Sequence, residues 1–534
     1  MTLSKFPTGS LCAVLVFLFA VTLILPEVAV GAAEKKLTLT QLRALRKKLA
    51  HRKRRIIFNN DGDDIAGLGG AEDEDPKEKK SAASTPEGLL QVRTTPLVGS
   101  QVDSIFYHSA WGLKLYHGDG PYGELYDAPD VDRTATVNRM KLLLNYGKDP
   151  LDVMIDFCRQ HDLEIFFSNR MNDTHDWYFP GYLYHIKVRH PEYTIGHARQ
   201  GKSREESLKN MLMTRTISTA LNYELQEIRD LVVGAMQEVC QTYDVDGIEL
   251  DYFRGYGLFP TSPATPEQIE LLNDMMRNIR QMTEEEGLRR GRPILIAARC
   301  INDSDWSLTR GLDVQTWLEE DLIDILMPFQ ILRHKGRRPL KSFFELAHRY
   351  DVSVYPTMQE REWRSSWAIC RGEAMSRFAE GADGIATFNR FDPTHRLWRE
   401  LGDPALLRDL DKTYRCPYYL PATVTAKGCD PLVLSVGDDV TSAPPANKQR
   451  TLKLRIHIGG VTESHHLQVH LNGRPLEVES ALPAPGPERQ KIWFEFAPAA
   501  ALFAAAENQL TAKINHTAGS VEIENVELEV RLTD

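Results

Sequence analysis

The sequence predicts an α/β protein, a (β/α)8 barrel followed by a separate antiparallel β-sandwich. Between about residues 55 and 412, short apolar segments alternate with amphipathic helical stretches, as in a barrel of parallel strands. After Pro417 the pattern changes to short alternating runs with no helical stretch between them. A chain of 534 residues is also too long for one compact domain, so two folded domains are expected.

The eight predicted barrel strands are apolar runs that end in polar residues. They are RIIFNN (55–60), DSIFYHS (103–109), LEIFFSNR (163–170), VDGIELDYF (245–253), PILIAAR (293–299), DILMPFQ (324–330), VSVYPTM (352–358) and DGIATFN (383–389). A strand within residues 214–233 would place RIIFNN outside the barrel, but VDGIELDYF would remain the fourth strand. A doubly wound sheet is the alternative, and the count of eight and the missing glycine-rich phosphate loop argue against it.

The N-terminus is predicted to direct export to the periplasm or the medium. Residues 1–33 combine Lys5, the apolar run LCAVLVFLFAVTLIL and the small-residue sequence AVGAA, which is the layout of a secretory signal peptide. An uncleaved membrane anchor is the alternative, and no other segment is long and apolar enough to span a bilayer. Residues 34–54 are strongly basic with leucines at helical spacing, which predicts a helix packed under the next domain or, alternatively, a membrane-surface contact.

The C-terminal region, residues 418–534, is predicted to be the β-sandwich accessory domain. Asn472-Gly473 between two apolar runs is a strong hairpin signal. Among the six cysteines that follow the signal, Cys416 and Cys429 could form a disulfide in an oxidising compartment, and buried free thiols are the equal alternative.

Several function classes are disfavoured by composition and by missing motifs. A net charge of −10 argues against a nucleic-acid partner. The first strand has no HxH pair for a catalytic metal, and the loop Asn59–Asp64 lacks the spacing of a calcium loop. We therefore expect no metal and no cofactor; oligomeric state is not readable from the sequence.

Two carboxylates occur on alternate positions of the predicted fourth strand. Residues two apart on a strand share a face, so Glu249 and Asp251 are both expected to point into the barrel. Asp251 would lie at the C-terminal mouth, where the active sites of such barrels are found. Glu249 would lie about 6–7 Å deeper, where Arg299 of the next strand could neutralise its charge.

Polar and aromatic residues follow the other predicted strands and suit a carbohydrate ligand, because indole rings stack on sugar rings while amides, arginines and carboxylates bind hydroxyls. The predicted substrate-binding residues are Trp111, Asn169, Arg170, Asp173, Tyr252, Arg299, Asp303, Trp306, Gln330 and Asn389.

Cleavage of a glycoside needs two carboxyl groups across the bond, about 5–5.5 Å apart for retention and farther apart for inversion. We predict Asp251 as the first and Glu360, after the seventh strand, as the second, with Glu249 in support. The alternatives for the second carboxylate are Asp303, Asp305 and the cluster Asp61, Asp63 and Asp64.

The segments VDGIELDYFR and AARCINDSDWSLTRGLDVQTWLEEDLIDILMPF, with RRIIFNNDGDD and TTPLVGSQVDSIFYHS, resemble the glycosyl-hydrolase-like, family-10-related TIM-barrel proteins of exported bacterial origin. The resemblance covers most of residues 55–400 and implies a barrel, a carbohydrate substrate and an acidic site on the fourth strand. The run Leu250-Asp251-Tyr252 lacks the final Glu of the chitinase-like DxxDxDxE signature, and the fourth strand lacks the Asn-Glu pair of xylanases.

The sequence thus predicts an exported glycoside hydrolase that acts on a poly- or oligosaccharide. A carbohydrate-binding barrel protein without catalytic activity is the alternative, because the same amides and aromatic residues would serve it without a carboxyl pair.

Overall fold

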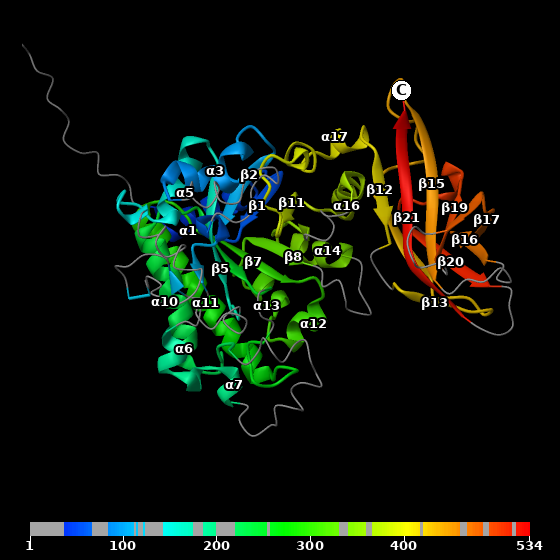
Figure 1. Cartoon of the computed structure of the whole chain (residues 1–534). Coiled ribbons are helices and arrows are strands. Elements are labelled where there is room, and N and C mark those ends of the chain that lie inside the picture. Colours follow the sequence, from blue (N-terminus) through cyan, green and yellow to red (C-terminus); the bar gives the residue numbers. More distant parts are fainter. Residues whose placement is uncertain are drawn as a thin grey trace, which may run out of the picture.

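The computed structural model describes residues 37–66, 84–111, 114–115, 121–122, 143–174, 185–198, 219–253, 257–329, 340–358, 366–416, 420–459, 467–483, 491–514 and 520–533. These residues form a closed barrel of parallel strands surrounded by helices, and two antiparallel sheets beside it (Figure 1). The predicted fold class is therefore confirmed.

The barrel has eight strand positions, and all eight predicted strands are found. β1 pairs with both β2 and β11, which closes the ring, and β9 and β10 are two short pieces of the seventh strand, separated at Tyr355-Pro356. Proline has no N–H to donate to a neighbouring strand, which accounts for the interruption. The strands are β1 (Ile56–Asn60), β2 (Val102–Tyr107), β5 (Glu164–Arg170), β6 (Gly247–Asp251), β7 (Leu295–Ile301), β8 (Ile325–Phe329), β9 (Ser353–Val354), β10 (Thr357–Met358) and β11 (Ile385–Thr387).

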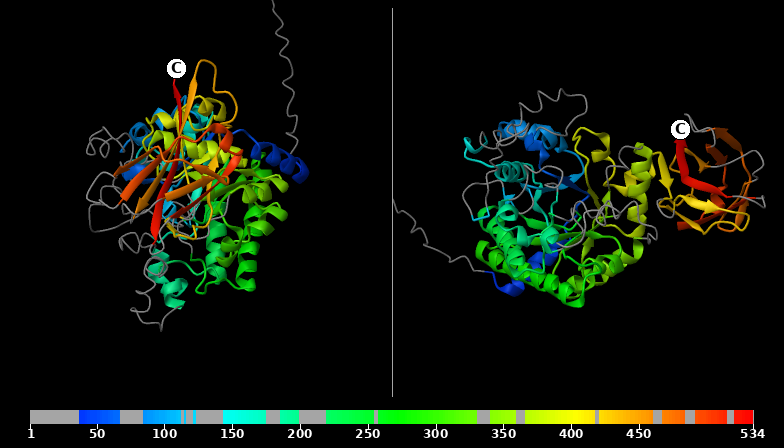
Figure 2. Two further views of the ribbon diagram at one scale, coloured as in Figure 1. Left: turned by 90° about the vertical axis from the view of Figure 1, so that its right-hand side faces the viewer. Right: turned by 60° about the horizontal axis from the view of Figure 1, so that its bottom comes forward.

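Helices surround the barrel, as the view in the right half of Figure 2 shows. Several begin at a side chain that accepts a backbone N–H, for example Asp149 before α5 and Thr265 before α11. The helices are α3 (Pro86–Arg93), α5 (Pro150–Gln160), α6 (His185–Arg189), α7 (Ile195–Ala198), α10 (Gln226–Thr242), α11 (Pro266–Arg290), α12 (Ser304–Thr309), α13 (Val314–Glu319), α14 (Lys341–Arg349), α16 (Trp367–Glu380) and α17 (Pro404–Arg408). Within residues 219–233 the chain forms the start of α10 and contributes no strand to the barrel.

The basic N-terminal segment forms the helix α1 (Leu39–Ala50), which closes the N-terminal end of the barrel. Its Ala50 packs with the inward-facing apolar side chains of the strands, among them Phe106, Phe166 and Tyr355. The C-terminal end of this helix thus packs against the barrel strands. No helix among the described residues is long and apolar enough to cross a membrane.

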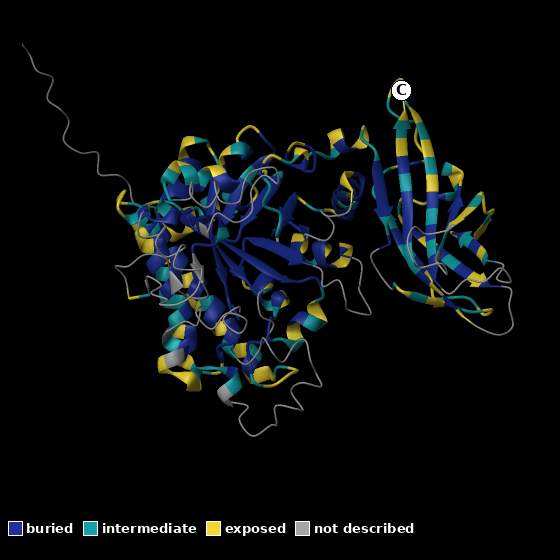
Figure 3. Ribbon diagram, viewed as in Figure 1, coloured by how far each residue is buried: buried dark blue, intermediate teal, exposed yellow. Residues whose placement is uncertain are grey.

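The C-terminal sheets form a β-sandwich whose strands alternate buried and exposed residues (Figure 3). The larger sheet holds β12 (Lys412–Arg415), β13 (Ala422–Val424), β15 (Gln449–Gly459), β18 (Ser480–Pro483), β19 (Lys491–Phe496) and β21 (Val521–Thr533), and the smaller one holds β14 (Leu432–Val436), β16 (Leu467–Leu471), β17 (Arg474–Leu476) and β20 (Ala506–Ile514).

The hairpin predicted at Asn472-Gly473 is confirmed, with positive φ at both residues between β16 and β17. Cys416 and Cys429 are free thiols: Cys416 donates to the carbonyl of Val433, and Cys429 accepts from the N–H of Ala512. The disulfide considered for this pair is not formed.

Candidate functional site

The two carboxylates of β6 both face the barrel interior. Asp251 is the last residue of the strand, and the parallel register places it between Arg170 of β5 and Arg299 of β7. Its Oδ2 lies 3.5 Å from Nη1 of Arg299, and its side chain is almost entirely buried. Asp251 therefore lies at the C-terminal end of the strands, where barrel active sites are built.

Glu249 lies one strand repeat below Asp251 and is fully enclosed. The predicted contact with Arg299 is present, with 2.6 Å between Glu249 Oε1 and Arg299 Nη2. Burial raises the pKa of Glu249 to about 7; Arg299 opposes this rise, and the negative charge of Asp251 adds to it. Near neutral pH this carboxyl group is therefore balanced between its charged and neutral forms.

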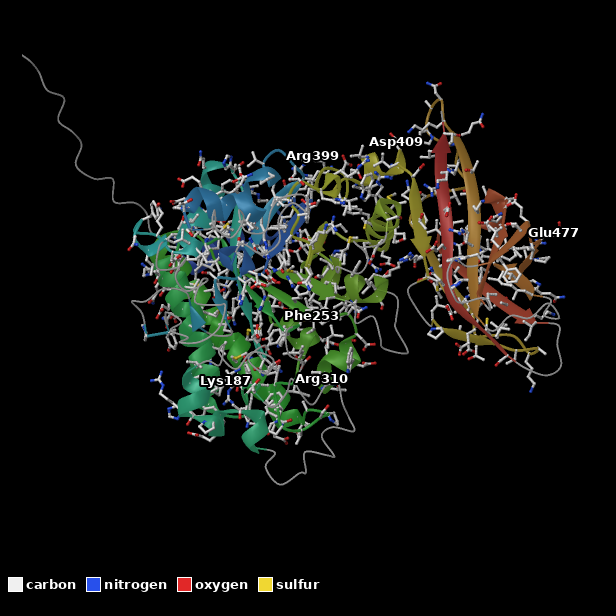
Figure 4. The ribbon with its side chains drawn as sticks, viewed as in Figure 1. Lys187, Phe253, Arg310, Arg399, Asp409 and Glu477 are labelled. Atoms are coloured by element: carbon white, nitrogen blue, oxygen red, sulfur yellow. The ribbon has the colours of Figure 1, made fainter. Side chains whose placement is uncertain are left out.

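An aromatic group lies against Asp251 and Arg299. The backbone N–H of Phe253 donates to Asp251 Oδ1 at 2.8 Å, and the ring of Phe253 meets Phe329 and Phe388 edge to face. The guanidinium of Arg299 lies 4.9 Å from the ring centre of Phe388. Figure 4 places Phe253 among the barrel strands. Asp251 is thus held by its position at the strand end, by the N–H of Phe253 and by the buried cation of Arg299.

A second group of charges joins β1 and β5 at the same end of the barrel. Arg170 donates to Asp173 Oδ2 at 2.8 Å and to the backbone oxygen of Asp61 at 3.3 Å. The carboxylate of Asp61 also accepts from Arg93, whose guanidinium lies 3.7 Å from the ring centre of Phe391. All four charged side chains are buried, so their geometry is fixed by mutual pairing.

Besides atoms of the Glu249–Arg299 ion pair, three buried polar atoms that face the barrel interior have no hydrogen-bond partner in the part of the chain that the structure describes. They are Oδ1 of Asn59, Nε2 of His108 and Oγ1 of Thr357. Neither Asn59 nor His108 is among the substrate-binding residues predicted from the sequence. The signal was present in the sequence, because His108 shares strand parity with the buried residue Phe106.

Three predicted substrate-binding residues are placed differently by the structure. Tyr252 points outward: its hydroxyl lies 3.3 Å from Met276 of α11, and its ring packs beside Trp317 of α13. Asn169 also faces the helix layer, because its register partner is Leu250 and its amide contacts Met171. Adjacent strand residues point to opposite faces, so neither can share the mouth with Asp251 or Arg170.

Arg299 is the third of these residues. It faces inward as predicted, but its side chain is fully buried, and it contacts both carboxylates of β6. Its described contacts are therefore with the two site carboxylates, which makes it a positioning residue.

The rim residues are half-exposed. Asp303 caps α12 by accepting the N–H of Trp306 at 2.9 Å, and Arg310 lies 5.9 Å from the ring centre of Trp306. Asn389, two residues beyond the end of β11, has a positive φ of 55°. Lys187 of α6 is buried and donates to the backbone oxygen of Asp173 at 3.1 Å. In Figure 4 Lys187 and Arg310 both lie in the lower part of the view.

The remaining acidic candidates are divided by burial. Asp64 is fully buried and accepts from Asn60 and from the hydroxyl of Tyr107, which makes it a structural residue. Asp63 and Asp305 lie in the first turns of η1 (Asp63–Ala66) and α12. Glu360 and Gln330 lie outside the described residues, as does the side chain of Trp111 in β3 (Ala110–Trp111).

Within the described ranges, no three His, Cys, Asp or Glu side chains converge in a way that could hold a metal ion. The described site is thus made of carboxylates, arginines, amides, one imidazole and phenyl rings. It can hold a carboxylate rigidly beside apolar ring edges and can bind hydroxyl groups, which is what a sugar site needs.

The chain matches no protein-family model and no curated protein. Among solved structures it is similar to an alpha-galactosidase of glycoside hydrolase family 36 from Geobacillus stearothermophilus, at 10% identity over 92% of this chain and 59% of that one, with a TM-score of 0.35. A maltogenic alpha-amylase from Thermotoga neapolitana gives 10% identity over 87% of this chain and 100% of that one, with a TM-score of 0.32. Alpha-L-fucosidase isoenzyme 2 from Paenibacillus thiaminolyticus gives 14% identity, 66% and 49% coverage and a TM-score of 0.34. The chain spans about three fifths of the alpha-galactosidase, and the likeness is one of fold alone.

Proposed function

We propose that the protein is a glycoside hydrolase that acts on a poly- or oligosaccharide, with Asp251 as general acid/base or nucleophile. One observation carries the proposal: Asp251 faces inward at the C-terminal end of β6, with Oδ1 fixed by the N–H of Phe253 at 2.8 Å. A carboxylate held in one orientation beside a buried cation can attack or protonate a bound glycoside without first reorganising.

Glu249 and Arg299 support Asp251 as positioning residues. Arg299 contacts Glu249 at 2.6 Å and Asp251 at 3.5 Å, so its one charge is shared between two carboxyl groups. Any change in the protonation of Glu249 alters how much of that charge acts on Asp251. The deeper carboxyl thereby tunes the upper one.

The second carboxylate of the pair is proposed to follow strand seven or strand five of the barrel. Asp303, after β7, is half-exposed and lies two residues beyond the strand end. Glu360, two residues beyond the end of β10, remains the first choice from the sequence.

The test is release of reducing sugar from a broad panel of polysaccharides by the full protein and by Asp251→Asn. We expect kcat to fall on the order of 10²–10⁴-fold in the variant, because the amide can neither accept a proton nor attack. Asp230→Asn, on the exposed face of α10, is the matched control and should retain full activity.

Survival of activity in Asp251→Asn would keep the enzyme but reject this residue. Glu360→Gln and Asp303→Asn, assayed on the same panel, identify the second carboxylate by the same criterion. No activity from any form, together with retention of a glycan on an affinity gel, would replace the hydrolase with a carbohydrate-binding protein.

Export is part of the proposal and rests on the layout of residues 1–33. The test is mass spectrometry of the protein that an expressing bacterium releases outside its cytoplasm. A mass that retains the first 33 residues would contradict cleavage near Ala32.

A further inference from the structure

His108, which directly follows β2, is held rigidly by backbone contacts. Its N–H donates to the carbonyl of Asn60 at 2.9 Å, so the residue continues the pairing of β1 with β2. Gly62, with φ of +80°, approaches the His108 carbonyl so closely that an added Cβ would lie 2.0 Å from its oxygen. The loop after β1 therefore closes over His108 and fixes its position.

The same geometry fixes the tautomer of the imidazole. Nδ1 of His108 lies 2.7 Å from the backbone oxygen of Ser168 in β5. A carbonyl oxygen can only accept, so Nδ1 carries the proton. Burial, followed by the positive charge of Arg170, lowers the pKa of His108 to about 3, and the ring is neutral at physiological pH. Nε2 is consequently an acceptor with a free lone pair.

This acceptor is enclosed and faces the barrel interior. Nε2 has no hydrogen-bond partner among the described residues, and the side chain of His108 is 2% exposed. Oδ1 of Asn59, the inward residue of the adjacent strand β1, is a second buried acceptor without a partner there. Buried acceptors left unpaired are costly, so two of them on neighbouring strands indicate a place for a donor.

We propose that His108 is a specificity-determining residue whose Nε2 accepts a hydrogen bond from a hydroxyl group of a neutral sugar, with Oδ1 of Asn59 accepting a second. The inference rests on the proposed function and deepens it, because it assigns recognition of hydroxyls to the β1–β2 side of the mouth and chemistry to β6. A sugar that lacks the hydroxyl would leave Nε2 buried and unpaired, and such sites discriminate strongly against the deoxy compound.

The first measurement is made in the Asp251→Asn protein, which separates binding from turnover. Glucose, galactose, mannose, xylose and their monodeoxy forms are titrated into this protein by calorimetry. The same titrations are repeated after adding His108→Phe or His108→Gln to the Asp251→Asn protein. Adding His470→Phe, on β16, gives the matched control. We expect at least one sugar to bind about tenfold more tightly than one of its deoxy forms, with that ratio near one in His108→Phe. His108→Gln, whose amide oxygen can replace Nε2, should restore part of the ratio, and His470→Phe should leave it unchanged.

The second measurement is nuclear magnetic resonance, which depends neither on catalysis nor on the ratio of sugar affinities. In protein labelled with ¹⁵N-histidine, the resonance lost in His108→Gln identifies His108, and its shifts report the Nδ1–H tautomer with an unprotonated Nε2. Adding the same sugars should move the Nε2 resonance toward the position of a hydrogen-bonded nitrogen.

The outcomes separate this inference from the proposed function. Hydrolysis with an unchanged deoxy ratio in His108→Phe would overturn the role of His108 and keep the enzyme. A sugar-dependent Nε2 shift without hydrolysis would keep the role of His108 and reject the enzyme. If no sugar on the panel binds or moves Nε2, the inference is overturned, and water is the donor in this site.

Discussion

At the scale of single residues, the site depends on which charges are enclosed together. Arg299 is fully buried and faces two carboxyl groups, while Arg170 pairs with Asp173 and Asp61 on the other side of Asp251. Removing water from such a group makes each protonation state depend on its neighbours. The titration of Glu249 is the clearest consequence.

Replacing Glu249 with Gln should make stability depend less on pH. Because the pKa of Glu249 is raised from 4.5 to about 7, mainly by burial, the folded state holds this proton more tightly than the unfolded chain does. The free energy of unfolding of the natural protein therefore falls as pH rises from about 4.5 to 7, and Glu249→Gln removes that fall. Between pH 5 and pH 8, the free energy of unfolding of the variant should rise by about 2 kcal/mol relative to that of the natural protein.

Urea unfolding followed at pH 5, 6, 7 and 8 measures this difference. Glu267→Gln, fully exposed in the first turn of α11, is the matched control and should give a much smaller change. If the free energy of unfolding of Glu249→Gln minus that of the natural protein stays constant or falls with rising pH, Glu249 is already ionised at pH 5.

At the scale of elements, α1 packs against the N-terminal end of the barrel strands. Arg54, just before β1, is fully buried and donates to Glu164 through Nη2 at 2.8 Å, while Ser104 donates to the same carboxylate at 2.7 Å. Arg54 also donates to the carbonyls of Leu49 and Ala50 at the C-terminal end of α1. One arginine thus satisfies the end of the helix and the start of β5 together.

Arg54→Met should destabilise the barrel by about 3–5 kcal/mol, because Glu164 would be left buried without its cation. Differential scanning calorimetry measures the loss, with the exposed neighbour Lys53→Met as the control. The double variant Arg54→Met/Glu164→Leu should be more stable than Arg54→Met alone, because apolar pairs replace buried ion pairs at little cost. Equal stability of the single and double variants would mean that the charge of Glu164 is not the cause.

At the scale of the whole molecule, the β-sandwich is joined to the barrel along α16 (Figure 1). Gly437, after β14, lies so close to α16 that an added Cβ would be 2.3 Å from the carbonyl oxygen of Met375. Ser376 donates to the carbonyl of Ser435 at 2.9 Å, which fixes the same approach. The contact is backbone against backbone, so it tolerates no added side chain.

Gly437→Ala should separate the two domains at this contact and lower stability by about 1–3 kcal/mol, because neither backbone can yield. Gly459→Ala is the matched control, since the atom nearest to its added Cβ is the flexible carboxylate end of Glu524. Thermal unfolding and limited proteolysis between barrel and sandwich measure the effect. Equal transition temperatures for the two variants would show that the domains can shift without cost.

Much of the fold and part of the candidate site were predictable from the sequence. The eight strands, the helix α1 and the hairpin at Asn472-Gly473 follow from local periodicity and turn chemistry, which depend on neighbouring residues only. The inward direction of Glu249 and Asp251 follows from the same period of two. The outward directions of Tyr252 and Asn169 follow from it as well, because each adjoins an inward residue.

What only the tertiary structure decided is which distant residues meet. Arg54 and Glu164 are 110 residues apart, and His108 finds Ser168 at a separation of 60. Local periodicity gives the face of each strand, whereas the register between strands gives the partners, and register is fixed by packing of the whole barrel. The sequence by itself therefore determined a barrel with acidic residues at its mouth. Only the tertiary structure shows that Arg299 is enclosed and that Nε2 of His108 has no partner among the described residues. Burial and pairing depend on all the strands together.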